Sequence, residues 1–141
     1  MRYLYIFTLF DPVSGRPRCT GIRAGSKTII KDLYRPGAGK TYRVISNARE
    51  EIKDIILKAN KNNKSIVISD FKSHVKQFEL PLLHSKYNVY DIHLPNIRPG
   101  KNQAKDSVIV KAVLDKMQRA NIKEYHKIMA NASVVYQSME E

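Results

Sequence analysis

The chain has 141 residues, enough for one domain with a hydrophobic core, and no stretch is typical of a linker between two. Its 25 Lys and Arg against 13 Asp and Glu give a net charge of +12, which favours polyanionic partners, nucleic acid first among them. No apolar run approaches the roughly 18 residues of a membrane span, and no secretory signal is recognisable. The single cysteine excludes an internal disulfide. We therefore expect a cytoplasmic protein without a membrane partner, with one domain over residues 1–141.

The first stretch of the chain, residues 2–10, predicts a central strand. Nearly every position carries a bulky apolar or aromatic side chain, which is typical of a strand buried on both faces. Asp11-Pro12 then begins a turn that ends at Gly15. Extended stretches are expected at residues 18–24 and 27–34, so that three strands form a meander.

The middle of the chain predicts two helices around a buried strand. After a loop at residues 35–39 and a short extended piece at 41–45, a helix is expected at residues 48–61. Asn47 and Glu50 have the spacing of a capping box in front of it, and one face of the helix carries Ile52, Ile55, Ile56 and Ala59.

A β-branched triplet then indicates a strand at residues 65–69, and a helix is expected at residues 71–83, broken or kinked at Pro81. Residues 87–93 predict a further strand and residues 95–101 a basic loop. From about residue 103 the chain is expected to be helical to its end, with a break near Asn121. The first part has Val108, Ala112, Val113 and Met117 at helical spacing, and the second part covers residues 125–136.

This order of elements predicts an α/β fold with a mixed central sheet. The three-strand meander is followed by strands separated by crossover helices, which place those strands in parallel. Helices would flank both faces of the sheet. The same order of strands and helices is that of ribonuclease H-like domains.

Three aspartates are candidate metal ligands. Asp11 and Asp70 each follow a strand, and the two strands are expected to be neighbours in the sheet. Asp106 stands in the first turn of the helix that comes after the last predicted strand. Converging carboxylates hold Mg²⁺, or Mn²⁺ in its place, in phosphodiester hydrolysis. Each residue also has a local alternative: Asp11 as a turn residue, Asp70 as an N-cap and Asp106 as a favourable charge at a helix start.

The other motifs do not indicate a catalytic or metal-binding function. Gly39-Lys40-Thr41 is not expected to form a phosphate-binding loop, because Tyr34 takes the place of the first glycine and a strand-like piece follows. No pair of histidines has metal-ligand spacing, and Cys19 has no signature of a nucleophile around it.

Residues 10–22, Phe-Asp-Pro-Val-Ser-Gly-Arg-Pro-Arg-Cys-Thr-Gly-Ile, resemble the Asp-Pro-Gly turn and later Thr-Gly of RuvC-type Holliday junction resolvases and their YqgF relatives. Asp70 stands where that family places its second acid, and residues 103–112 are similar to the helix that bears its last acids. A rival placement aligns residues 131–138 with the terminal helix of the YqgF relatives, which puts Asn131 where the family has aspartate.

The resemblance implies a ribonuclease H-like domain that acts as a Mg²⁺-dependent endonuclease on branched DNA in recombination, as a two-fold dimer. Asp11, Asp70 and Asp106 would be its catalytic metal ligands. The basic residues expected to contact phosphates are Arg16, Arg18, Arg35, Lys40, Arg43, Arg98 and Lys101. Val13 in place of glycine and a single acid in the last helix leave two alternatives open: a non-catalytic nucleic-acid-binding module, or a basic subunit of a larger assembly that docks on an acidic partner.

Overall fold

The structure, a computed structural model, describes residues 3–36, 42–44, 47–81, 86–92, 94, 97–100, 105–119 and 126–131. Its strands are β1 (Tyr3–Phe10), β2 (Pro17–Ala24), β3 (Lys27–Asp32), β4 (Tyr34–Pro36), β5 (Tyr42–Val44), β6 (Ser65–Ser69), β7 (Lys86–Ile92) and β8 (His126–Asn131). Its helices are α1 (Ala48–Lys61), α2 (Phe71–Phe78) and α3 (Asp106–Arg119).

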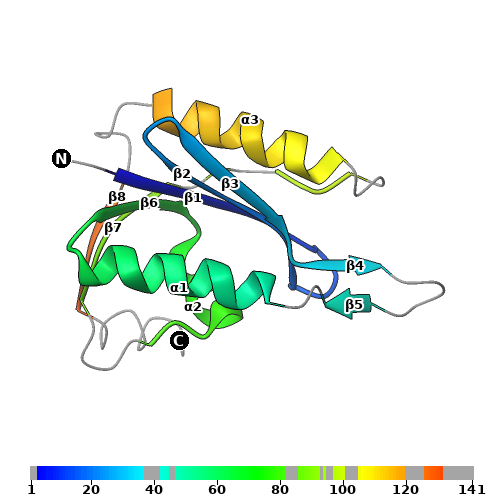
Figure 1. Cartoon of the computed structure of the whole chain (residues 1–141), viewed down its shortest axis with the longest axis horizontal. Coiled ribbons are helices and arrows are strands. Elements are labelled where there is room, and N and C mark those ends of the chain that lie inside the picture. The colour runs from blue at the N-terminus through cyan, green and yellow to red at the C-terminus, as the bar shows by residue number, and fades with distance from the viewer. Residues whose placement is uncertain are drawn as a thin grey trace.

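Six of the strands form one mixed sheet in the order β3-β2-β1-β6-β7-β8, and β4 pairs with β5 in a separate hairpin. β1 runs parallel to β6, and β6 runs parallel to β7, while β2, β3 and β8 pair with their neighbours in antiparallel fashion. Figure 1 shows α3 on one face of the sheet and α1 with α2 on the other. The predicted mixed α/β fold, with its meander and its parallel strands, is confirmed.

β1 lies at the centre because its side chains supply both halves of the core. Leu4 and Ile6 belong to the apolar cluster under α1 and α2, and Phe7 and Leu9 belong to the cluster under α3. Such alternation follows from the two-residue period of a strand. The predicted strand buried on both faces is therefore confirmed.

β6 is the second buried strand. Ile66, Val67 and Ile68 are all 0% exposed, as the β-branched triplet predicts. Ile66 and Ile68 face the α1 and α2 side, whereas Val67 packs in the α3 cluster. Because β6 pairs with both β1 and β7, its backbone is satisfied on both edges.

Gly21 in β2 allows α3 to approach the sheet closely. A Cβ atom built at this position would lie 2.7 Å from the Cδ1 atom of Leu114 and closer still to the Cγ1 atom of Val110. Real side chains do not tolerate such contacts, so the glycine sets the distance between α3 and β2.

The buried face of α3 differs from the predicted one. Val110, Val113, Leu114 and Met117 are buried, whereas Val108 is 67% exposed and Ala112 is exposed. The helix turns the stripe that contains Val110 and Leu114 towards Gly21, which moves Val108 to the solvent side. The prediction that Val108 and Ala112 share the core face is therefore wrong.

The predicted helix over residues 125–136 is also wrong where the structure describes it. Residues 126–131 form β8, an antiparallel strand paired with β7 from Lys86↔Asn131 to Asp91↔His126. A short apolar stretch fits helix and strand spacing alike, and the edge of β7 offers backbone partners that decide between them. Residues 132–136 lie outside the described residues.

Smaller differences concern helix ends and one loop. α1 has the predicted bounds, but Asn47 has φ 69° and makes no side-chain cap, so the capping-box prediction is wrong. α2 ends at Phe78, short of the break expected at Pro81, because Glu79 takes a left-handed backbone conformation. Part of the loop expected at residues 35–39 belongs to β4, paired with β5. None of the described helices is long and apolar enough to cross a membrane.

Candidate functional site

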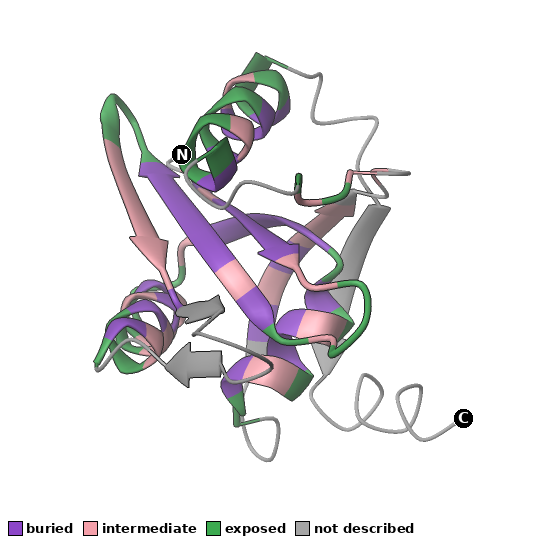
Figure 2. Cartoon of the chain, turned by 90° about the vertical axis from the view of Figure 1, so that its right-hand side faces the viewer, coloured by how far each residue is buried: buried purple, intermediate pink, exposed green. Residues whose placement is uncertain are grey.

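Four strands end at one edge of the sheet, which we call the carboxyl edge. β1, β6 and β7 are parallel, and β3 has the same direction as β1 because each is antiparallel to β2. The carboxyl edge therefore gathers the β1–β2 turn, the β4–β5 hairpin, the start of α2 and residues 97–100 (Figure 1). In Figure 1 the hairpin and the start of α3 mark this edge on the right. Figure 2 looks onto it and shows exposed turns beside buried strand ends.

Asp11 opens the β1–β2 turn. Its Oδ2 atom accepts a hydrogen bond from the Ser14 amide at 2.8 Å, and its carbonyl accepts one from Gly15, which has φ 73°. Partial burial works to raise the pKa of Asp11, but the hydrogen bonds from Ser14 and the charge of Arg18 outweigh it, so the pKa lies below its usual value. Asp11 therefore stabilises the turn, which was the alternative to its predicted role as a metal ligand, and its carboxylate is ionised at neutral pH.

Val13, at the tip of this turn, stands where the resolvases have glycine. It is 92% exposed and is not among the residues with positive φ. The left-handed position of the turn belongs to Gly15 instead. The turn therefore accommodates valine without steric cost, and this departure from the family pattern does not disturb it.

Asp70 follows β6 and is the N-cap of α2. Its carboxylate accepts hydrogen bonds from the Ser73 amide at 3.3 Å and the Ser73 hydroxyl at 2.6 Å. Its φ of 61° is uncommon for a residue other than glycine. Asp91 of β7, for which no role was predicted, accepts hydrogen bonds from the amides of Asp70 at 2.8 Å and Phe71 at 3.2 Å. Two carboxylates thus satisfy the first amides of this helix.

Asp106 is held by Arg18. The guanidinium donates to both carboxylate oxygens, from Nε at 3.1 Å and from Nη2 at 3.3 Å, and the side chain of Asp106 is 0% exposed whereas that of Arg18 is 13% exposed. Burial raises the pKa of Asp106, Arg18 partly counteracts this and Asp32 adds to it, so that the pKa lies above its usual value. Nearby Cys19 is buried, and burial, followed by Asp32 and Asp106, raises the pKa of its thiol to about 12. Cys19 is therefore no nucleophile at neutral pH.

The three aspartates do not fit a shared metal site in this arrangement. A divalent cation at Asp106 would have to displace the Arg18 guanidinium, which already occupies both carboxylate oxygens with a positive charge. The other two aspartates are more accessible than Asp106, since Asp11 is half-buried and Asp70 is exposed. Among the described residues, no three His, Cys, Asp or Glu side chains form a group that could hold a metal ion.

The basic residues predicted to contact phosphates divide into four sets. Arg16 is exposed in the β1–β2 turn, and Arg98 is exposed in the segment of residues 97–100, which Figure 1 shows beside the start of α3. Arg35 and Arg43 are register partners in the β4–β5 hairpin at the same edge. Arg18 belongs to the ion pair with Asp106, a role that the sequence did not reveal. Lys40, with the Gly39-Lys40-Thr41 triplet, and Lys101 lie outside the described residues.

Comparisons with known proteins assign no family to this chain. A scan against protein-family models finds no match, and searches of curated proteins and of solved structures find no significant match either. The resemblance to the resolvases therefore rests on the residues quoted above and stays a prediction.

A buried polar network behind the carboxyl edge was not predicted. His74 of α2 is 0% exposed, with Nδ1 2.9 Å from the Asp70 carbonyl and Nε2 2.8 Å from the Thr8 hydroxyl, which is itself 2.7 Å from the Thr20 hydroxyl. A carbonyl can only accept, so Nδ1 carries the proton and Nε2 accepts from Thr8. Burial lowers the pKa of His74 to about 4, and the imidazole is neutral at pH 7. The network joins α2 to β1 and β2 and thereby positions Asp70.

Proposed function

We propose that this chain is a ribonuclease H-like nucleic-acid-binding domain that grips the phosphates of branched or structured DNA at the carboxyl edge. The observation that carries the proposal is the placement of basic residues. Arg16, Arg98 and the hairpin with Arg35 and Arg43 all lie at the edge where four strands end. Ligands of open α/β sheets commonly bind outside the carboxyl ends of the strands.

The charge of the whole chain supports the same partner. A net charge of +12 attracts a polyanion over distances longer than single contacts, and each phosphate neutralised releases counterions. The meander and parallel strands in the sheet order β3-β2-β1-β6-β7-β8 support a ribonuclease H-like order, to which β8 adds an antiparallel edge strand that the sequence did not predict. A fold alone does not fix a function, so the basic edge carries the argument.

A matched pair of double variants tests this proposal. Arg16→Ala with Arg98→Ala removes two cations from the carboxyl edge, and Lys58→Ala with Lys61→Ala removes two exposed cations from the last turn of α1. Both proteins lose the same charge. We expect the edge variant to bind a four-way DNA junction at least tenfold more weakly, with a salt slope lower by about 1.8, because each lost phosphate contact removes about 0.9. Equal losses in the two variants would overturn the assignment of the edge.

Cleavage of branched DNA with Mg²⁺ or Mn²⁺ is a second candidate function. One observation favours it: Asp11 and Asp70 follow neighbouring parallel strands and lie at the same edge as the basic residues. The Arg18–Asp106 pair argues against a third ligand. We therefore propose nucleic-acid binding as the function of the chain, with cleavage as the second candidate.

Asp11→Asn separates the two functions. If the protein cleaves a junction with Mg²⁺ or Mn²⁺, the variant should lose cleavage and keep binding, because phosphate contacts do not need the carboxylate. Asp54→Asn is the matched control, since Asp54 is exposed on α1. Wild-type protein that binds without cutting would remove the second candidate, and cutting that persists in Asp11→Asn would leave Asp11 a turn residue only.

A further inference from the structure

A pocket lies at the opposite edge of the sheet, where β1 begins. Its volume is about 460 Å³, and its walls come from Tyr3 and Tyr5 of β1, Ala24 and Gly25 at the β2–β3 turn, Lys64 in front of β6, and Gln118 of α3. This edge is remote from the carboxyl edge, because β1 and β6 both begin here and end there. The functions assigned to the carboxyl edge therefore do not account for the pocket.

The tyrosine rings are the main feature of the pocket. Tyr3 and Tyr5 occupy alternate positions of β1 and so project from the same face of the sheet, with ring centroids 6.3 Å apart and planes at 53°. Tyr90 of β7 meets Tyr3 edge-on at 5.9 Å and 79°, which fixes the orientation of that ring. Both pocket tyrosines are only half-buried, so part of each ring surface stays open to a ligand.

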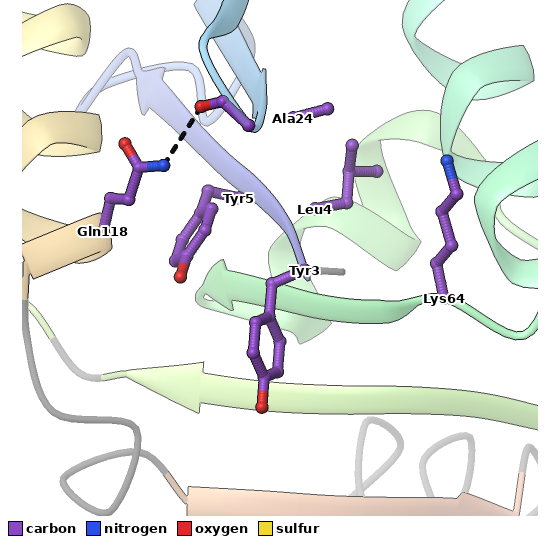
Figure 3. Close-up of a pocket in the computed structure, with 7 residues that line it drawn as sticks. Tyr3, Leu4, Tyr5, Ala24, Lys64 and Gln118 are labelled. Atoms are coloured by element: carbon purple, nitrogen blue, oxygen red, sulfur yellow. Dashed lines mark hydrogen bonds between the residues drawn. The ribbon is translucent and has the colours of Figure 1, made fainter. Parts of the chain in front are cut away.

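Polar groups complete the walls. The Gln118 amide donates to the Gly25 carbonyl at 3.1 Å, and its oxygen accepts from Arg23 at 3.4 Å, so this side chain is held in place. Figure 3 shows the Tyr5 ring and Gln118 on one side of β1 and Lys64 on the other, so that the pocket wraps around the first residues of the strand. Lys64 gives it a cation at the far wall.

We propose that this pocket holds an unpaired base of a single-stranded nucleic acid, stacked on the ring of Tyr5 with the tilted ring of Tyr3 at its side, and with Lys64 against a neighbouring phosphate. Proteins that bind single strands combine aromatic stacking surfaces with basic side chains, and both are present here. The volume lies within the range of about 300–1,000 Å³ that small-molecule sites occupy. This inference rests on the proposed nucleic-acid function and adds a second site to it, for the single-stranded part of a branched substrate.

Binding of a fluorescently labelled oligothymidylate to the full chain tests the proposal. Each stacked base contributes about 1–3 kcal/mol, so Tyr5→Leu is expected to weaken binding about 5- to 150-fold. Tyr3→Phe is expected to keep wild-type affinity, because it retains the ring. Lys64→Ala should weaken binding and lower the salt slope by about 0.7, the value for one phosphate of a single strand. These two variants keep the proposal testable if Tyr5→Leu does not fold.

The outcomes distinguish this inference from the proposed function. The double variant Arg16→Ala with Arg98→Ala should lose junction binding and keep oligothymidylate binding, and Tyr5→Leu should do the reverse. Wild-type protein that binds the junction but not the oligonucleotide would overturn the pocket alone. Unchanged oligonucleotide affinity in folded Tyr5→Leu and Lys64→Ala would do the same. Protein that binds neither ligand would overturn the proposed function together with this inference.

Discussion

Acidification from pH 7.5 to pH 5.0 is expected to destabilise the fold through His74. Burial lowers the pKa of this histidine from 6.5 to about 4, so the unfolded chain binds a proton in a pH range where the folded chain does not. The contribution of neutral His74 to the free energy of unfolding is fully present above pH 6.5, the pKa in the unfolded chain, and it is lost as the pH falls towards 4. The loss should reach about 2 kcal/mol at pH 5.0 and about 3 kcal/mol below pH 4, at about 1.4 kcal/mol per unit of pKa difference.

The structural cause is the burial of the imidazole, which would hold a charged ring away from water. In the neutral ring Nδ1 donates to the Asp70 carbonyl and Nε2 accepts from the Thr8 hydroxyl, so both nitrogens already have a partner. Phe78 stacks on the ring at 5.9 Å, and Phe10 meets it edge-on at 5.3 Å. These aromatic neighbours exclude the water that would stabilise an imidazolium.

Urea unfolding of the wild type and of His74→Gln at the two pH values measures the effect. At pH 7.5 the variant should be less stable than the wild type, because glutamine cannot reproduce both hydrogen bonds of the imidazole. On acidification, its free energy of unfolding should fall by about 2 kcal/mol less than that of the wild type. The comparison between the two proteins cancels the contributions of the other histidines and of the carboxylates. Equal pH dependence in both proteins would refute the reasoning.

Three further predictions concern packing and charge. Gly21→Ala should cost about 1–3 kcal/mol in the free energy of unfolding, because α3 must move away from β2, whereas Gly25→Ala tests the effect of a positive φ without a contact. Asp106→Ala should cost about 1–3 kcal/mol because the partly buried Arg18 guanidinium loses its carboxylate partner, and adding Arg18→Ala should restore part of that loss in a double-mutant cycle. Ile66→Asp should unfold the domain by burying an unpaired charge, and circular dichroism would reveal a retained fold that contradicts this.

The sequence predicted the elements whose patterns are strong and local. β1 and β6 are bulky and β-branched runs, and α1 has a clear apolar face, so their positions and burial follow from periodicity. β8 was mistaken for a helix because its identity depends on the edge of β7, about forty residues earlier in the chain. The rotation of α3 depends on Gly21, which no pattern within the helix reveals.

The candidate site was predictable in its location and less so in its contacts. Asp11 and Asp70 were expected at one edge because parallel strands end together, and the pairing of β1 with β6 confirms it. The Arg18–Asp106 pair joins residues 88 positions apart, so no local pattern indicates that Arg18 is paired with a carboxylate. The roles of Asp91 and His74 likewise depend on partners in other elements.

The most direct test of the central claim is the affinity of the wild-type protein for an immobile four-way DNA junction as a function of salt. If the four arginines of the carboxyl edge each neutralise one phosphate, the logarithm of the binding constant falls linearly with that of the salt concentration, with a slope of about −3.6. Affinity would then decrease about 150-fold between about 50 and 200 mM salt. Absence of binding at the lower concentration, or an affinity that does not change with salt, would contradict the account.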